Sequence, residues 1–276
     1  MSLQLLGIDF TSAPSRRKPI TVARGTLTGT RLALQRVDEL SDFESFDALL
    51  RESGPWLGAF DFPFGLPRVL VETLHWPREW LALMRHYATL SRADIREQFA
   101  AFCAARPAGR KFAHRACDGP AGSSPSMKWV NPPVAYMLHA GVPRLIDAGV
   151  HLPALHDGDA ARVALEAYPG LLARELVGSR SYKSDDKAKQ TPERLIARKD
   201  MLEALEQGKS RLGIRVAMSH AQRDALAADA SGDRLDALLC LVQAAWASTR
   251  AGHGLPQNID PLEGWIVSAP DPLLIR

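Results

Sequence analysis

The sequence predicts a mixed α/β fold in which helices flank a sheet. Short apolar runs bounded by turn residues predict buried strands, as at residues 5–8 and 56–60. Three such runs with short links, all within residues 5–37, predict an antiparallel meander. From residue 77 onward, apolar residues recur mainly at three- and four-residue spacings, which predicts helices. Strands combined with a long helical portion indicate the α/β class.

The composition is that of a globular protein with ample core material. The 276 residues are 46% hydrophobic and 24% charged, which is ordinary for such a protein. A net charge of +3 and a pI near 8.8 permit a polyanionic partner without requiring one. The longest apolar stretch, residues 235–247, is too short to span a bilayer, and the N-terminus lacks a basic region followed by an apolar one. We therefore expect neither a membrane span nor a signal peptide.

Cysteine usage points to a reducing compartment. The three cysteines, Cys103, Cys117 and Cys240, are odd in number and widely spaced. This pattern predicts neither a disulfide framework nor a zinc site, and it fits the cytoplasm.

The first part of the chain is expected to form strands around a single helix. The predicted strands are residues 5–8, 19–23, 31–37 and 56–60. Residues 25–30 carry turn signals. The segment 41–44, Ser-Asp-Phe-Glu, fits a capping box in which Ser41 caps an amphipathic helix that ends at Gly54 and Pro55.

Helices are expected to dominate the rest. The predicted helices are residues 77–88, 91–106, 134–148, 171–177, 191–207, 219–229 and 233–249. Short strands are predicted at residues 162–168 and 263–267. Residues 107–125, rich in Gly, Pro and Ser, predict a long surface loop of the kind that is often functional.

Four acids occupy unusual places in this pattern. Asp9 and Asp61 each end a predicted buried strand, where an unpaired carboxylate is costly to desolvate. Asp233 and Asp236 are three residues apart at the start of the last predicted helix, so they lie on one face. Their charges repel, and a helix N-terminus offsets only about 0.3–1 kcal/mol per charge. Because the helix behind them is apolar nearly all round, we expect it to be buried.

These acids predict an oxygen-rich site for Mg²⁺ or Mn²⁺. A pair of such ions can activate a water and stabilise a leaving oxygen in phosphoryl transfer. There are plainer explanations: Asp9 can cap the loop after its strand, while Asp233 and Asp236 can be solvated helix-terminal acids. Glu166, in the strand predicted at residues 162–168, is a further candidate acid. It can equally face solvent or pair with a nearby arginine.

The element order is similar to that of the ribonuclease H-like fold: three strands, a helix, a strand, a helical region, a strand and a C-terminal helix. The Asp-x-x-Asp pair on the last helix resembles the arrangement in RuvC-type Holliday-junction resolvases. Five motifs together resemble, in order, the DUF429 family of predicted nucleases with this fold. These motifs are GIDFTSAP, FDFPFGLP, KWVNPPVAYM, EAYPG and GDRLDALLC.

The resemblance implies a single ribonuclease H-like domain over residues 1–276, with helical insertions at about 65–160 and 170–231. It also implies that Asp9, Asp61, Asp233 and Asp236 are catalytic residues that bind Mg²⁺ or Mn²⁺ in a nuclease, with nucleic acid as the substrate. A junction resolvase would act as a homodimer, although the sequence leaves the oligomeric state open.

Three basic residues are candidate substrate contacts. Arg115, Lys128 and Lys183 lie in or beside predicted loops, and phosphate backbones are bound by Lys and Arg. Lys128 stands next to Trp129, which adds a face for base stacking. The plainer explanation is that each is simply solvated on the surface.

Two other functions compete with a nuclease. Sugar kinases and actin-like ATPases share the ribonuclease H-like core and begin with a Gly-x-Asp strand whose following loop cradles ATP phosphates. Here no glycine follows Asp9 until Gly25, whereas such loops usually need one for close backbone approach. The other alternative is a non-catalytic binding module in which the acids are structural.

Overall fold

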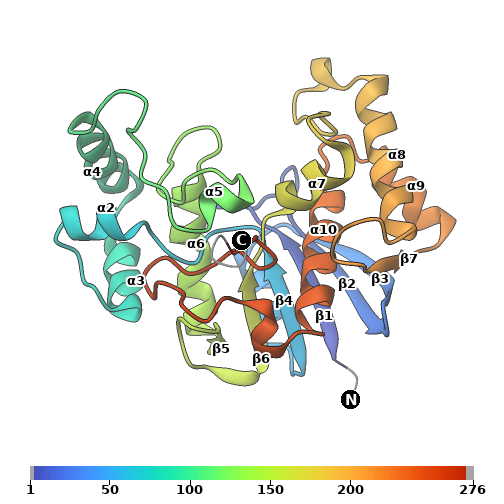
Figure 1. Ribbon diagram of the computed structural model, residues 1–276, viewed down its shortest axis with the longest axis horizontal. Coiled ribbons are helices and arrows are strands. Elements are labelled where there is room, and N and C mark those ends of the chain that lie inside the picture. Colours follow the sequence, from blue (N-terminus) through green and yellow to red (C-terminus); the bar gives the residue numbers. More distant parts are fainter. Residues whose placement is uncertain (1–2, 272–276) are drawn as a thin grey trace.

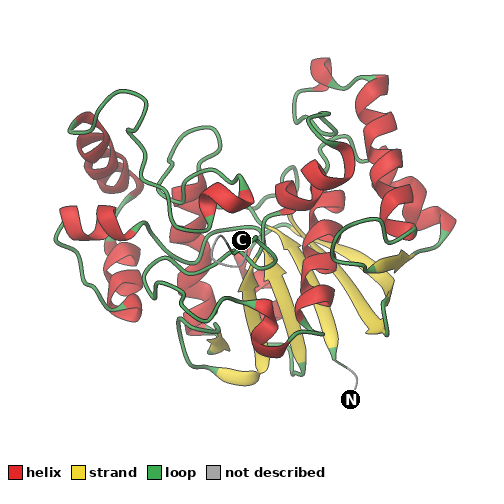
Figure 2. Ribbon diagram, in the orientation of Figure 1, coloured by secondary structure: helices red, strands yellow, loops and turns green. Residues whose placement is uncertain are grey.

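The computed structural model describes residues 3–271, whose strands form a seven-stranded sheet flanked by helices (Figures 1 and 2). The strands lie in the order β5-β6-β4-β1-β2-β3-β7. Strand β2 is antiparallel to both its neighbours, and the other neighbouring pairs are parallel. The strand bounds are β1 (Gln4–Asp9), β2 (Ile20–Thr28), β3 (Arg31–Leu40), β4 (Trp56–Phe60), β5 (Val150–His151), β6 (Asp159–Glu166) and β7 (Arg215–Ala217).

Helices lie on both sides of the sheet. The α-helices are α1 (Phe43–Leu50), α2 (Arg68–Thr73), α3 (Trp80–Thr89), α4 (Arg92–Ala104), α5 (Asp118–Ala121), α6 (Val134–Asp147), α7 (Pro169–Val177), α8 (Pro192–Glu206), α9 (His220–Ala228) and α10 (Asp233–Ala247). The short 3₁₀ helices are η1 (Lys187–Lys189) and η2 (Ala251–Gly254). Helices α2–α6 gather at one end of the molecule, and α8 and α9 stand at the other (Figure 1). The α/β prediction is confirmed, and the arrangement is compatible with a ribonuclease H-like fold.

Strand alternation decides which face each side chain of β1 occupies. Successive side chains of a strand point to opposite faces. Leu6 and Ile8 belong to the core cluster under α1, α3 and α6, whereas Leu5 belongs to the cluster under α7, α8 and α10. Gly7 and Asp9 follow the parity of Leu5. The carboxylate that ends β1 is therefore directed to the α10 face of the sheet.

Gly7 lets α10 lie directly on β1. A Cβ atom at this position would stand 2.1 Å from the carbonyl oxygen of Ala237 and 2.1 Å from the backbone nitrogen of Leu241. No side chain fits in that space, so the helix backbone packs against the strand backbone. Helix α10 is buried along almost its whole length, as the sequence predicted. This packing brings its first turn beside the carboxyl end of β1.

Most predicted elements are present, with bounds that differ by a few residues. The sequence prediction missed the helices α2 and α5 and the strands β5 and β7, which are too short to show a clear period. Ser41 is not the cap of α1, because the Asp42 side chain accepts the backbone N–H of Ser45 at 2.8 Å. The tail strand predicted at residues 263–267 is reduced to an isolated bridge between Ile266 and Glu166.

Two expectations from composition can be compared with the structure. Cys103, Cys117 and Cys240 are free and buried, in agreement with the prediction of no disulfide framework. Within residues 3–271, no helix has both the length and the apolar character needed to cross a membrane.

Candidate carboxylate site

The structure brings the four predicted acids together at one edge of the sheet. Asp9 ends β1, Asp61 follows β4, and Asp233 and Asp236 form the first turn of α10. The backbone N–H of Asp61 donates to the carbonyl of Ile8 at 2.9 Å, which ties the two strand ends together. Since β1 and β4 are parallel, their carboxyl ends meet at the same edge. The four carboxylates were predicted as a group, and the structure places them near enough for the charges of the other three to act on Asp9.

Burial and the charges of neighbouring acids disfavour the charged forms of Asp9 and Asp61. Burial is the largest cause that raises the pKa of Asp9 well above its ordinary value, and the charges of Asp236, Asp233 and Asp61 add to it. Burial likewise raises the pKa of Asp61 to about 7. Among residues 3–271, no group donates a hydrogen bond to the carboxylate of Asp9 or Asp61. The charge of Lys183 lowers the pKa of both acids, but burial and the neighbouring carboxylates outweigh it.

Two lysines partly neutralise the acids on α10. The Lys183 ammonium donates to one carboxylate oxygen of Asp236, and the Tyr182 hydroxyl donates to the other at 2.5 Å. The Lys18 ammonium donates to Asp233 at 2.9 and 3.1 Å. Burial lowers the pKa of Lys183, but the charges of Asp236, Tyr182 and Asp9 together with the hydrogen bond to Asp236 outweigh it, so the pKa is raised overall. Two lysines against four carboxylates leave an excess of negative charge.

The donor chemistry of this group suits a hard divalent cation. Carboxylate oxygens are the ligands that Mg²⁺ and Mn²⁺ prefer. Of the four acids, Asp9 and Asp61 accept no hydrogen bond and form no salt bridge within the described part of the chain. A bound cation would therefore stabilise their charged forms most. Within residues 3–271, no three acidic, histidine or cysteine side chains converge closely enough to form a ready cation site. In this structure Lys183 pairs with Asp236 and Lys18 pairs with Asp233, so each acid on α10 already has a cationic partner.

Glu166 is not part of this cluster, because the alternation of β6 directs it elsewhere. Its carboxylate pairs with Arg115, whose two terminal nitrogens donate to it at 2.6 and 2.7 Å. Arg115 also donates to Asp118 at 2.9 and 3.1 Å. Glu166 is buried and paired with an arginine, one of the two alternatives that the sequence left open. The expectation that residues 107–125 form a surface loop is wrong around Arg115 and Asp118, because these charges are buried together.

Comparison with known proteins adds one assignment. The family model described as "Protein of unknown function (DUF429)" matches residues 7–260, which is most of the chain. The chain belongs to the DUF429 family. No curated protein and no solved structure matches this DUF429 protein.

The basic residues predicted as substrate contacts have different surroundings in this DUF429 protein. Arg115 has its guanidinium engaged by buried acids, with its side chain 2% exposed. Lys128 lies in the turn before α6, where its carbonyl accepts the Ala135 N–H at 2.9 Å. The ring of the neighbouring Trp129 packs against Phe112, with centroids 5.4 Å apart. The Trp129 ring is partly buried, so its role as a face for base stacking stays a prediction. Lys183, in contrast, reaches the carboxylate cluster.

Sequence reasoning missed three residues that shape the cluster. Lys18 and Tyr182 contact Asp233 and Asp236 directly. Arg198 is buried on α8 and donates to the carbonyl of Tyr182 at 2.7 Å, which holds this segment in place. The only signal in the sequence was that Tyr182 adjoins the candidate Lys183. Nothing in the sequence around Lys18 distinguishes it from a solvated lysine.

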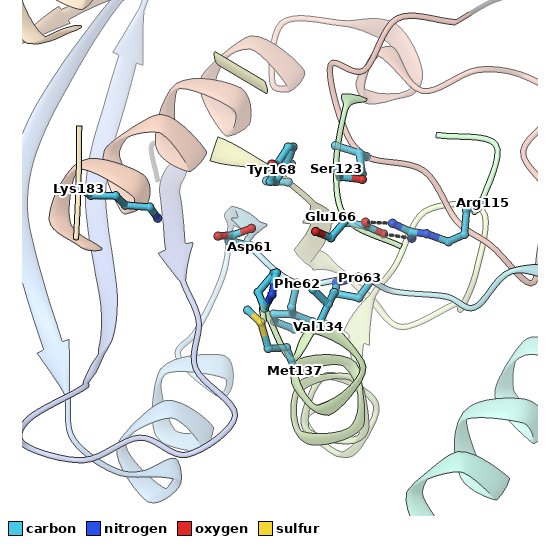
Figure 3. Close-up of a pocket in the computed structure, with 14 residues that line it drawn as sticks. Asp61, Phe62, Pro63, Arg115, Ser123, Val134, Met137, Glu166, Tyr168 and Lys183 are labelled. Carbon is cyan, nitrogen blue, oxygen red and sulfur yellow. Dashed lines mark hydrogen bonds and ion pairs between the residues drawn. The ribbon is translucent and has the colours of Figure 1, made fainter. Parts of the chain in front are cut away.

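A cavity of about 330 Å³ opens beside the cluster. Figure 3 shows Asp61 near its centre, with Lys183 approaching from one side and the Arg115–Glu166 pair on the other. Tyr168 and Ser123 lie on one wall, and Phe62, Val134 and Met137 lie on the opposite wall. Asp61 thus faces a space that a small organic group can enter.

Proposed function

We propose that this DUF429 protein hydrolyses phosphodiester bonds of nucleic acid at the carboxylate cluster. In this proposal, Mg²⁺ or Mn²⁺ is held by Asp9, Asp61, Asp233 and Asp236. The observation that carries it is the position of Asp9 and Asp61, desolvated and without a hydrogen-bond donor within residues 3–271, next to two further acids. Buried carboxylates that repel one another are stabilised by a bound cation, and a cation at such a site commonly serves catalysis.

In this proposal, the residues around the metal site have different roles. When bound, the metal ion supplies an activated water and stabilisation of the leaving oxygen. Asp9 and Asp61 contribute fixed anionic oxygens from rigid strand ends. The Tyr182 hydroxyl orients Asp236 by its hydrogen bond. The ammonium of Lys183 adds positive charge that attracts a phosphate group to the cluster.

Calorimetric titration with Mn²⁺ and no nucleotide tests the metal site. The variants are Asp9→Asn and, as a matched control, Asp157→Asn, because the Asp157 side chain is fully exposed and remote from the cluster. We expect one or two binding sites in the wild type and in the control, and loss of binding in Asp9→Asn. Equal binding by Asp9→Asn and the wild type would exclude Asp9 as a ligand.

Cleavage assays with the same proteins test the reaction. Labelled single-stranded and duplex DNA and RNA, and a four-way junction, are incubated with Mn²⁺. We expect Asp9→Asn to abolish cleavage while its circular dichroism spectrum matches that of the wild type. An Asp9→Asn protein that cuts at the wild-type rate would refute the mechanism.

A non-catalytic binding module is the second candidate, and the lysines favour it. Lys183 forms a salt bridge with Asp236, and Lys18 forms one with Asp233. If the acids serve only to hold these lysines, divalent ions will not raise the melting temperature, and replacing Asp9 will leave ligand binding unchanged. A melting curve with and without Mn²⁺ separates the two candidates.

A further inference from the structure

The cavity beside Asp61 combines apolar walls with a polar end. Phe62, Val134 and Met137 form one wall, and the ring of Tyr168 stands across from them (Figure 3). Such walls favour a flat, partly apolar group and offer nothing to a bare phosphate. At the far end lies Glu166 with its arginine.

The charges at this end of the cavity select for a neutral group that carries N–H donors. The two cations that line the cavity are already paired, Arg115 with Glu166 and Lys183 with Asp236, which leaves the Asp61 carboxylate without a salt bridge within residues 3–271. This excess of negative charge repels an anion. A purely apolar group would leave the Asp61 carboxylate without a hydrogen-bond donor, which is costly in a buried place. A heterocycle with amino or imino N–H groups meets both requirements.

A second cavity of about 360 Å³ has the opposite character. Its lining includes Arg174, Arg180 and Lys183, which suit phosphate groups. It shares Asp61, Tyr168 and Lys183 with the first cavity, so the two spaces meet at the carboxylate cluster. A ligand that spans both must place a neutral ring in one and a phosphate in the other.

We infer that the first cavity receives an unpaired nucleobase while the adjoining phosphates lie along Arg180 and Lys183. A base inside a duplex stack cannot enter such a cavity unless it is flipped out, so the substrate is single-stranded or locally opened nucleic acid. This inference deepens the proposed function and rests on it for cleavage. Binding of the base does not depend on cleavage.

Binding of nucleoside monophosphates in EDTA tests the inference without metal or catalysis. The probes are AMP, CMP, GMP and UMP, with inorganic phosphate as a separate probe, measured by calorimetry. We expect at least one monophosphate to bind, and Val134→Trp to weaken it roughly tenfold or more by filling the cavity. Val69→Trp, on the exposed side of α2, is the matched control and should bind within about twofold of the wild type. Met137→Trp replaces Val134→Trp if the latter does not melt cooperatively.

The outcomes separate this inference from the proposed function. Three results would overturn the inference. They are no binding of any monophosphate, unchanged binding in Val134→Trp or its replacement Met137→Trp, and binding of inorganic phosphate as tight as that of a monophosphate. If a monophosphate binds and Val134→Trp weakens it, but no strand is cut with Mn²⁺, the inference stands and the nuclease proposal fails. If single and double strands are cut equally fast and Val134→Trp cuts normally, the inference fails and the nuclease proposal stands.

Discussion

Replacing Arg115 by methionine should expose how strongly the buried charge network holds this protein together. Arg115 makes two hydrogen bonds to Asp118, two to Glu166 and one to the Glu263 carbonyl at 3.0 Å. Methionine keeps much of the side-chain length but removes the positive charge, so Glu166 and Asp118 remain buried without their cation. Breaking a buried ion pair in this way costs about 3–5 kcal/mol. With a urea dependence of about 3 kcal/mol per M, the unfolding midpoint should fall by roughly 1 to 1.7 M.

Urea unfolding at pH 7.5, followed by circular dichroism, measures this loss. Arg36→Met is the control, since Arg36 is 61% exposed and its pair with Asp38 lies at the surface. The control should lose no more than about 1 kcal/mol. Adding Glu166→Gln to Arg115→Met should recover part of the stability, because the two changes act on one network. If Arg115→Met costs as little as Arg36→Met, the network does not stabilise the fold and our reasoning is refuted.

Two further predictions concern the carboxylate cluster. Burial raises the pKa of Asp61 from 3.8 to about 7, so between these values the folded chain binds more protons than the unfolded chain and its free energy of unfolding falls as pH rises. Asp61→Asn should therefore flatten this decline in metal-free urea unfolding between pH 4 and 7, and an unchanged slope would contradict it. Lys183→Met should bind Mn²⁺ more tightly in calorimetry, since the ammonium ion competes with a metal for Asp236. Weaker binding would show that Lys183 does not compete.

The sequence carried enough information for the sheet and the long helices. Apolar runs such as that of β4, and the continuous apolar surface of α10, are local patterns with a clear period. Strand β7 spans three residues and pairs with β3. Three residues are too few to show a local period, so the sequence alone does not predict this strand. The cap of α1 was placed one residue too early, because Ser41 and Asp42 are both good capping residues and only the backbone path decides between them.

The carboxylate cluster also has features that the sequence predicts and features that depend on tertiary structure. Asp9, Asp61, Asp233 and Asp236 could be predicted as a group, because each stands at the end of an element whose direction follows from the pattern of the chain. Tertiary structure alone decided that Glu166 lies outside the group. Its partner Arg115 comes from a segment 51 residues away, and the pairing places both side chains in the interior.

The sequence by itself determined which residues sit at strand ends and at a helix start, since hydrophobic periodicity and helix caps are local properties. Tertiary structure alone decided which cations compensate those acids. Lys18 and Asp233 are 215 residues apart, and they meet because α10 packs on the bare backbone of Gly7. A salt bridge of this kind depends on the relative placement of elements that are distant in the sequence. A short window of sequence does not determine that placement.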